Sequence, residues 1–137
     1  MSEDKYMISD LYNLMSEDII REKRPDILAL GISVGFISST KAKTIGKTKL
    51  VLGECRKVTD LQKLFCPHDF LIIIYEPNCE GLTEEQMKIL LWHELKHIGV
   101  DEEGETYVVP HDIEEFRDII EAHGLDWQNV PRGTIGG

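Results

Sequence analysis

Apolar residues along the chain follow two spacings, and their order predicts a mixed α+β fold. At residues 7 to 23 they recur every three or four positions, which indicates an amphipathic helix that ends at Pro25. Residues 27 to 37 and 48 to 58 are rich in strand-forming side chains, and the lysine-rich segment between them predicts a hairpin. The continuous apolar run Phe70–Tyr75 predicts a third strand, buried on both faces.

A second long helix is predicted at residues 83 to 98. Thr83 and Gln86 have the spacing of a capping box at its start, and Gly99 would terminate it. One side of this helix is apolar, and we expect it to face the core; it consists of Met87, Leu91, Leu95 and Ile98. Shorter elements are expected at residues 60 to 65 (helix), at residues 107 to 109 (extended) and after Asp112, which can cap a final helix.

Length and composition fit one domain with one core. The chain has 137 residues, of which 42% are hydrophobic and 29% charged. We assign residues 1–125 to this domain and expect the C-terminal tail, residues 126–137, to be partly disordered. No apolar run approaches the roughly 18 residues of a membrane span, and the polar, acidic start argues against a secretory signal. The three cysteines, Cys55, Cys66 and Cys79, include no CxxC pair, so we expect buried or partly buried thiols in a reducing cytoplasm.

The net charge of -10 disfavours a general affinity for nucleic acid, because binding to phosphates requires a basic face. One group of basic residues is a local exception. We interpret it as a solvated hairpin edge guarded by lysines, with a partner-binding patch as the alternative. It comprises Lys41, Lys43, Lys47, Lys49, Arg56 and Lys57.

The candidate chemistry lies in the sequence His93-Glu94-Leu95-Lys96-His97, an HExxH motif inside the predicted helix. Residues four apart on a helix lie one above the other, so the rings of His93 and His97 can reach one tetrahedral zinc ion. Glu94 lies about 100° further round the helix, where it can take a proton from metal-bound water. The motif is short and can occur by chance, but the capping box, the apolar flank and a downstream histidine favour a metal site.

A catalytic zinc usually has three protein ligands, and the best third candidate is His111, fourteen residues after His97. A carboxylate can replace an imidazole, so Glu114 and Glu115 remain alternatives, and Glu115 could instead orient one of the rings. Three neutral imidazoles would leave the ion its full charge and lower the pKa of its water towards about 7.

Other polar residues favour structural interpretations. His68 is predicted to be a satisfied loop histidine, and His123 lies at a helix C-terminus, where the dipole favours imidazolium. Tyr107 could stabilise an oxyanion, although simple packing is the stronger interpretation. A metzincin site is excluded, because its longer motif would require glycine and histidine where this chain has Val100 and Glu103.

The order of these features resembles a known family. Strand 70–75, the HELKH helix, the acidic glycine turn and the stretch that begins at Pro110-His111 are similar to the putative phage metallopeptidase family, which is similar in turn to SprT/Spartan-type zincin proteases. The resemblance covers residues 5 to 125, and its specific part is residues 83 to 120. It implies a zincin-like α+β fold: a small mixed β-sheet with a backing helix, an HExxH active-site helix and a C-terminal helix.

The resemblance also implies His93, His97 and His111 as zinc ligands and Glu94 as the catalytic residue. In SprT-type proteins the third ligand begins an H-x-x-E-F-like stretch, and His111 is followed by Asp-Ile-Glu-Glu-Phe with one residue of difference. The chain has no cysteine-rich zinc ribbon and no basic tail after this region, so repair of DNA–protein crosslinks is not implied.

The sequence therefore predicts a zinc-dependent metallopeptidase that acts on a protein or peptide substrate. The alternative from another class is a metal-binding or interaction module without turnover, such as a phage or prophage accessory protein. A metal-free α+β domain is the third hypothesis.

Overall fold

The computed structural model describes residues 6–46 and 49–109. Its main sheet has four strands in the order β1-β2-β6-β5. In chain order these strands are β1 (Tyr6–Ile8), β2 (Val34–Ser39), β5 (Gly53–Lys57) and β6 (Phe70–Tyr75). The sheet is mixed, because β2 runs parallel to β6 whereas β1 and β5 are antiparallel to their neighbours. Strand β6 occupies a central position, which agrees with its continuous apolar sequence.

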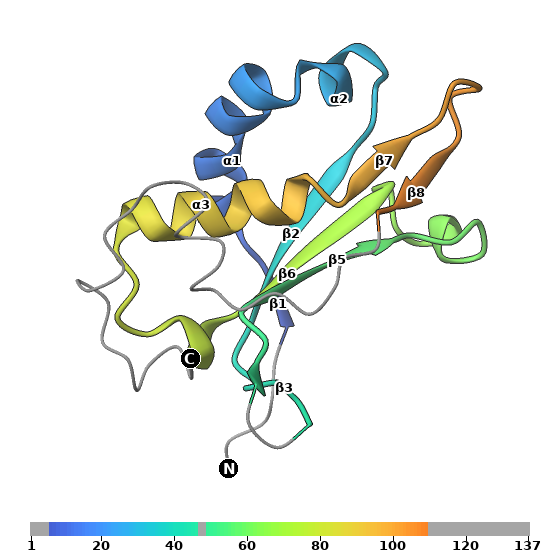
Figure 1. Cartoon of the computed structure of the whole chain (residues 1–137). Helices are drawn as coiled ribbons and strands as arrows, with labels where there is room; N and C mark the ends of the chain where they lie inside the picture. The colour runs from blue at the N-terminus through green and yellow to red at the C-terminus, as the bar shows by residue number, and fades with distance from the viewer. Residues whose placement is uncertain (1–5, 47–48, 110–137) are drawn as a thin grey trace.

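The helices and the smaller elements complete the described fold. Figure 1 shows the α-helices on one side of the main sheet; they are α1 (Asp10–Lys23), α2 (Pro25–Ala29) and α3 (Glu84–Leu95). Two short 3-10 turns follow β5 and β6, and they are η1 (Gln62–Leu64) and η2 (Glu76–Cys79). Two small antiparallel ribbons pair β3 (Thr44–Ile45) with β4 (Lys49–Leu50) and β7 (Ile98–Val100) with β8 (Thr106–Val108). None of the described helices has the length and apolar character needed to cross a membrane.

The core forms where the helices cover the sheet. Side chains alternate between the two faces of a strand, and Phe70, Ile72 and Ile74 are fully buried in the same core cluster as three leucines of α3. These leucines are Leu90, Leu91 and Leu95. Full burial of such a side chain contributes roughly 1.5–3 kcal/mol. This packing fixes the position of α3, and therefore of the HExxH motif, above the sheet.

The predicted mixed α+β class with a small mixed sheet is confirmed, and the strand at residues 70–75 has the predicted bounds. The first helix begins three residues later than predicted, at Asp10, because residues 6–8 pair with β2 and Ser9 caps the helix. Residues 60–65 contain only a 3-10 turn. The predicted final helix and the tail at 126–137 lie outside the described residues.

The predicted hairpin between residues 27–37 and 48–58 is wrong. Residues 25–29 form α2, which begins at a proline suited to the first helical turn, and the strand starts only at Val34. Strands β2 and β5 do not pair; they lie on either side of β6. The hydrophobic pattern identified the strands but not their partners, because the pairing depends on β6, which comes later in the chain.

Candidate metal centre

Helix α3 carries the candidate metal ligands, and its start is fixed by the predicted capping box. The hydroxyl of Thr83 accepts the backbone N–H of Gln86 at 3.1 Å, and the Gln86 side chain accepts the backbone N–H of Thr83 at 2.8 Å. The expected core side of the helix is confirmed, since Leu91, Leu95 and Ile98 are buried and Met87 packs against them.

The helix ends at Leu95, three residues earlier than predicted, so His97 lies in the turn between α3 and β7. The backbone N–H of His97 reaches only to the carbonyl of Glu94, which tightens the last turn. Gly99 is not a helix cap but a residue of β7. A Cβ there would lie 2.5 Å from the ring of Tyr107, so this strand pair requires glycine for close approach.

The turn nevertheless brings the two imidazoles together. The Nε2 atoms of His93 and His97 are 3.2 Å apart, and the ring centroids are 4.8 Å apart with the planes almost perpendicular. Both histidines are buried, at 9% and 5% exposure. Lys96 between them is exposed, with its ammonium group over the ring of Trp92.

The tautomer of His97 follows from its hydrogen bond. Its Nδ1 lies 2.9 Å from the carbonyl oxygen of Val109, just after β8. A carbonyl can only accept, so Nδ1 carries the proton and Nε2 of the neutral ring has a lone pair. Such an outer hydrogen bond is the usual way in which a metal-binding histidine is oriented. The backbone N–H of Val109 also donates to the carbonyl of His97 at 2.6 Å, so Val109 contacts this residue through two hydrogen bonds.

Glu94 belongs to α3, and its side chain lies against the edge strand β5. Its side chain is 4% exposed, and a Cβ at Gly53 would lie 3.4 Å from its Cγ. Burial raises the pKa of the Cys55 thiol on the same strand to about 12, and the charge of Glu94 adds to this effect. The same two causes, together with Glu76, raise the pKa of Cys79 to about 12. Both thiols are therefore protonated near neutral pH and differ from the thiolates that bind metals.

The two histidines fit a zinc ion. With Zn–N distances of about 2.0–2.1 Å, a tetrahedral site separates two ligand nitrogens by about 3.3–3.4 Å. The 3.2 Å between the Nε2 atoms is close to this value. Two imidazoles do not complete a catalytic site, and among residues 6–46 and 49–109 no group of three potential ligand side chains comes together. The predicted third ligand His111 and its alternatives Glu114 and Glu115 lie outside the described residues.

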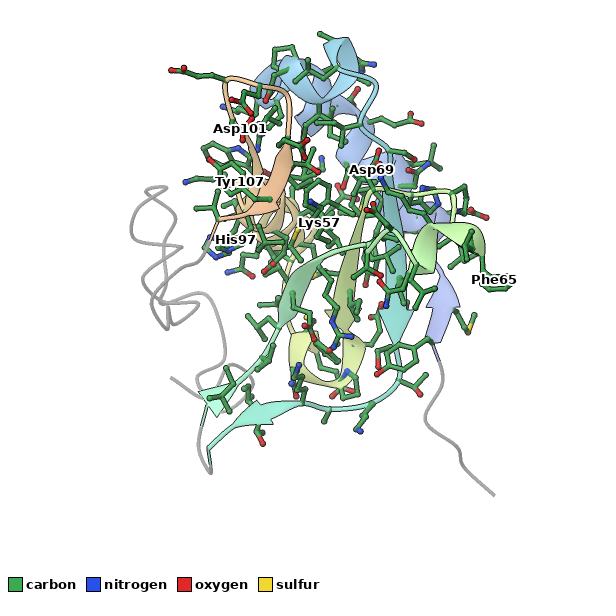
Figure 2. The ribbon with its side chains drawn as sticks, turned by 90° about the vertical axis from the view of Figure 1, so that its right-hand side faces the viewer. Lys57, Phe65, Asp69, His97, Asp101 and Tyr107 are labelled. Carbon is green, nitrogen blue, oxygen red and sulfur yellow. The ribbon has the colours of Figure 1, made fainter. Side chains whose placement is uncertain are left out.

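The remaining sequence predictions are placed as follows. His68 is a satisfied loop histidine, with its Nδ1 2.7 Å from the Ser33 hydroxyl. Figure 2 shows Tyr107 and His97 near each other, whereas Asp69, next to His68, lies on the other side of the view. Tyr107 is half-exposed and packs on Gly99, and its role in catalysis stays a prediction. His123 lies outside the described residues.

The cysteines and the basic group complete this comparison. The predicted buried or partly buried thiols are confirmed for Cys55, Cys66 and Cys79. Within the basic group, Lys43 and Arg56 both pair with Glu54, at 2.7 and 2.9 Å. Because these two cations form ion pairs within the fold, the structure favours the structural interpretation of the basic group over a partner-binding patch.

One residue of this region was not singled out from the sequence. The guanidinium of Arg24, between α1 and α2, donates to the backbone carbonyls of Leu95 and Ile98 on either side of His97. Its only sequence signal is a basic residue before Pro25, which is typical of any helix end. The contact joins residues 71 and 74 positions apart, so no local pattern could reveal it.

The sequence model of the family described as putative phage metallopeptidase matches residues 4–133. Neither the curated proteins nor the solved structures include a significant match.

Proposed function

The chain belongs to the putative phage metallopeptidase family, and from this premise we propose that it is a zinc-dependent peptidase that hydrolyses a peptide bond of a protein or peptide substrate. His93, His97 and His111 would hold the ion, and Glu94 would be the catalytic residue. Family membership supports a metal cofactor and a peptide substrate, and the finer assignment of residues is our proposal.

The observation that carries this proposal is the pair of Nε2 atoms 3.2 Å apart, one of which has its lone pair set by Val109. Such a pair is what a tetrahedral metal site requires of two neighbouring ligands. When bound, a zinc ion supplies a Lewis acid that lowers the pKa of water towards about 7 and polarises the scissile carbonyl.

Glu94 would transfer the protons of the reaction. It would accept a proton from the attacking water and later deliver it to the nitrogen of the leaving amine, a role worth roughly 10²–10⁴ in rate. The Glu94 side chain is buried against Gly53 of β5, which limits its rotamers, and Glu94 follows the ligand candidate His93 directly in the chain. General-base catalysis requires a carboxylate within hydrogen-bond reach of the reacting water.

The substrate would lie along β5. This strand is an edge of the main sheet, and Glu94 lies against it. An extended peptide can add to such an edge through backbone hydrogen bonds, which selects for chain conformation more than for side chains. Cleavage in extended, accessible segments of a protein substrate follows from this arrangement.

The test is the variant Glu94→Gln, with Glu85→Gln as the matched control because Glu85 is an exposed glutamate of the same helix. Glu94→Gln should keep zinc and the folded state but lose at least 100-fold in peptide cleavage, whereas Glu85→Gln should cleave at the wild-type rate. Cleavage by Glu94→Gln at the wild-type rate would exclude the role of Glu94. Wild-type protein that binds zinc without cleaving any extended peptide would instead support the module without turnover.

A further inference from the structure

Arg24 connects the far end of α1 to the turn that carries His97. Its Nη1 donates to the carbonyl of Leu95 at 2.6 Å, and its Nη2 donates to the carbonyl of Ile98 at 2.9 Å. Leu95 is the last residue of α3 and Ile98 the first of β7, so the guanidinium spans the whole turn.

These bonds satisfy backbone carbonyls at and just after the end of α3. The last carbonyls of a helix have no partner within it and must be satisfied by other groups. Here the carbonyl of Glu94 accepts the N–H of His97, and the carbonyl of His97 accepts the N–H of Val109. The guanidinium of Arg24 donates hydrogen bonds to the carbonyls of Leu95 and Ile98. A long-range side chain therefore replaces the local glycine cap that the sequence suggested.

The guanidinium itself is held in a fixed orientation. Its Nε and Nη2 donate to the two carboxylate oxygens of Asp26 at 3.0 and 2.9 Å, and the arginine side chain is 16% exposed. Hydrogen bonding from Arg24 lowers the pKa of Asp26, so the pair remains ionic near neutral pH. The planar fork of arginine can serve two carbonyls and a carboxylate at once, whereas a lysine ammonium is a point charge without this geometry. The positive charge also suits the negative end of the α3 dipole.

From this geometry we propose that Arg24 is a positioning residue for the metal ligand His97. Arg24 fixes the carbonyls on both sides of His97. It thereby keeps Nδ1 of the His97 ring hydrogen-bonded to the carbonyl of Val109, so that Nε2 carries no proton and is directed at His93. The inference rests on the proposed function in that His97 is taken as a zinc ligand. Arg24 touches neither substrate nor metal, and it acts through the turn alone.

The test compares full-length wild type with Arg24→Met, Arg24→Lys and the matched control Arg21→Met. Arg21 is an exposed arginine in the last turn of α1, three residues before Arg24, and it pairs with Asp18 of the same helix. Two quantities are measured: the Kd for zinc by chelator competition, and the solvent exchange of the His97 Nδ1–H proton by NMR before zinc is added. Urea unfolding of each variant separates local effects from a general loss of stability.

We expect Arg24→Met to weaken zinc binding roughly 10-fold or more, as loss of outer partners commonly does, and to accelerate Nδ1–H exchange at least as much. Arg24→Lys should fall between Arg24→Met and wild type, and it decides the question if Arg24→Met does not fold. Arg21→Met should match wild type. The proposal is overturned if Nδ1–H exchange is unchanged in Arg24→Met and Arg24→Lys, or if Arg21→Met has the same effect. A wild type that binds no zinc would contradict the proposed function, while the exchange measurement would still decide the role of Arg24.

Discussion

The variant Gly99→Ala tests the close packing of Gly99 against Tyr107 in the β7–β8 hairpin, which follows the turn that carries His97. A Cβ at this position would lie 2.5 Å from Cε2 and Cζ of Tyr107 and 2.9 Å from Cδ2. Ordinary carbon contacts are about 3.5–4.0 Å, so either the ring or the strand must move by about 1 Å. Overpacking of this kind costs typically 1–3 kcal/mol, and we expect about 1–2 kcal/mol because the half-exposed ring of Tyr107 can partly swing outward.

The assay is urea unfolding of Gly99→Ala, Tyr107→Ala and the double variant. With the ring removed, the added methyl group has room, so Gly99→Ala should cost almost nothing in the Tyr107→Ala background. Gly104→Ala is the matched control: its φ of +84° makes alanine costly by about 1 kcal/mol, but no atom lies within 4 Å of the new Cβ. Tyr107→Ala should therefore not relieve it. An unchanged cost of Gly99→Ala in both backgrounds would refute the reasoning.

Two further predictions concern pH and helix capping. Burial alone would raise the pKa of Glu54, but hydrogen bonds from Arg56, Lys43 and Tyr75 lower it to about 2, from an ordinary value of 4.5. Because the pKa of Glu54 is lower in the folded than in the unfolded state, its carboxylate stabilises the fold above pH 4.5, and this contribution is lost as pH falls towards 2. After solvent screening we expect the free energy of unfolding to fall by about 1–2 kcal/mol from this group, a loss that should be absent in Glu54→Gln. Thr83→Ala removes the α3 cap and should lower the free energy of unfolding by about 1 kcal/mol in urea, without changing zinc affinity. A stability that is flat between pH 5 and 2 in wild type, or a Thr83→Ala variant as stable as wild type, would contradict these two statements respectively.

Local chemistry accounts for the parts of the fold that the sequence predicts well. The capping box at Thr83 requires only residues three positions apart. The continuous apolar sequence of the strand at 70–75 is itself enough to predict that the strand is buried. The HExxH spacing likewise predicts that the rings of His93 and His97 lie close together, which they do although His97 follows the end of the helix. Each of these signals is complete within a few consecutive residues.

The failures come from contacts between distant segments. Nothing in residues 27–58 reveals that β6 lies between β2 and β5, so a hairpin was the simplest interpretation. The helix end at Leu95 depends on Arg24 and Val109, and the role of Gly99 depends on Tyr107 across the ribbon. A glycine after a helical stretch reads as a cap, whereas here it is needed because an aromatic ring lies directly over it.

The most direct test of the metal centre is the zinc content of the purified full-length chain, measured by elemental analysis beside His97→Ala and the control His68→Ala. The account predicts one zinc per chain in wild type and in His68→Ala, because His68 bonds Ser33 away from the centre, and strongly reduced zinc in His97→Ala. Zinc that is absent from wild type after incubation with the metal, or retained in full by His97→Ala, would contradict it.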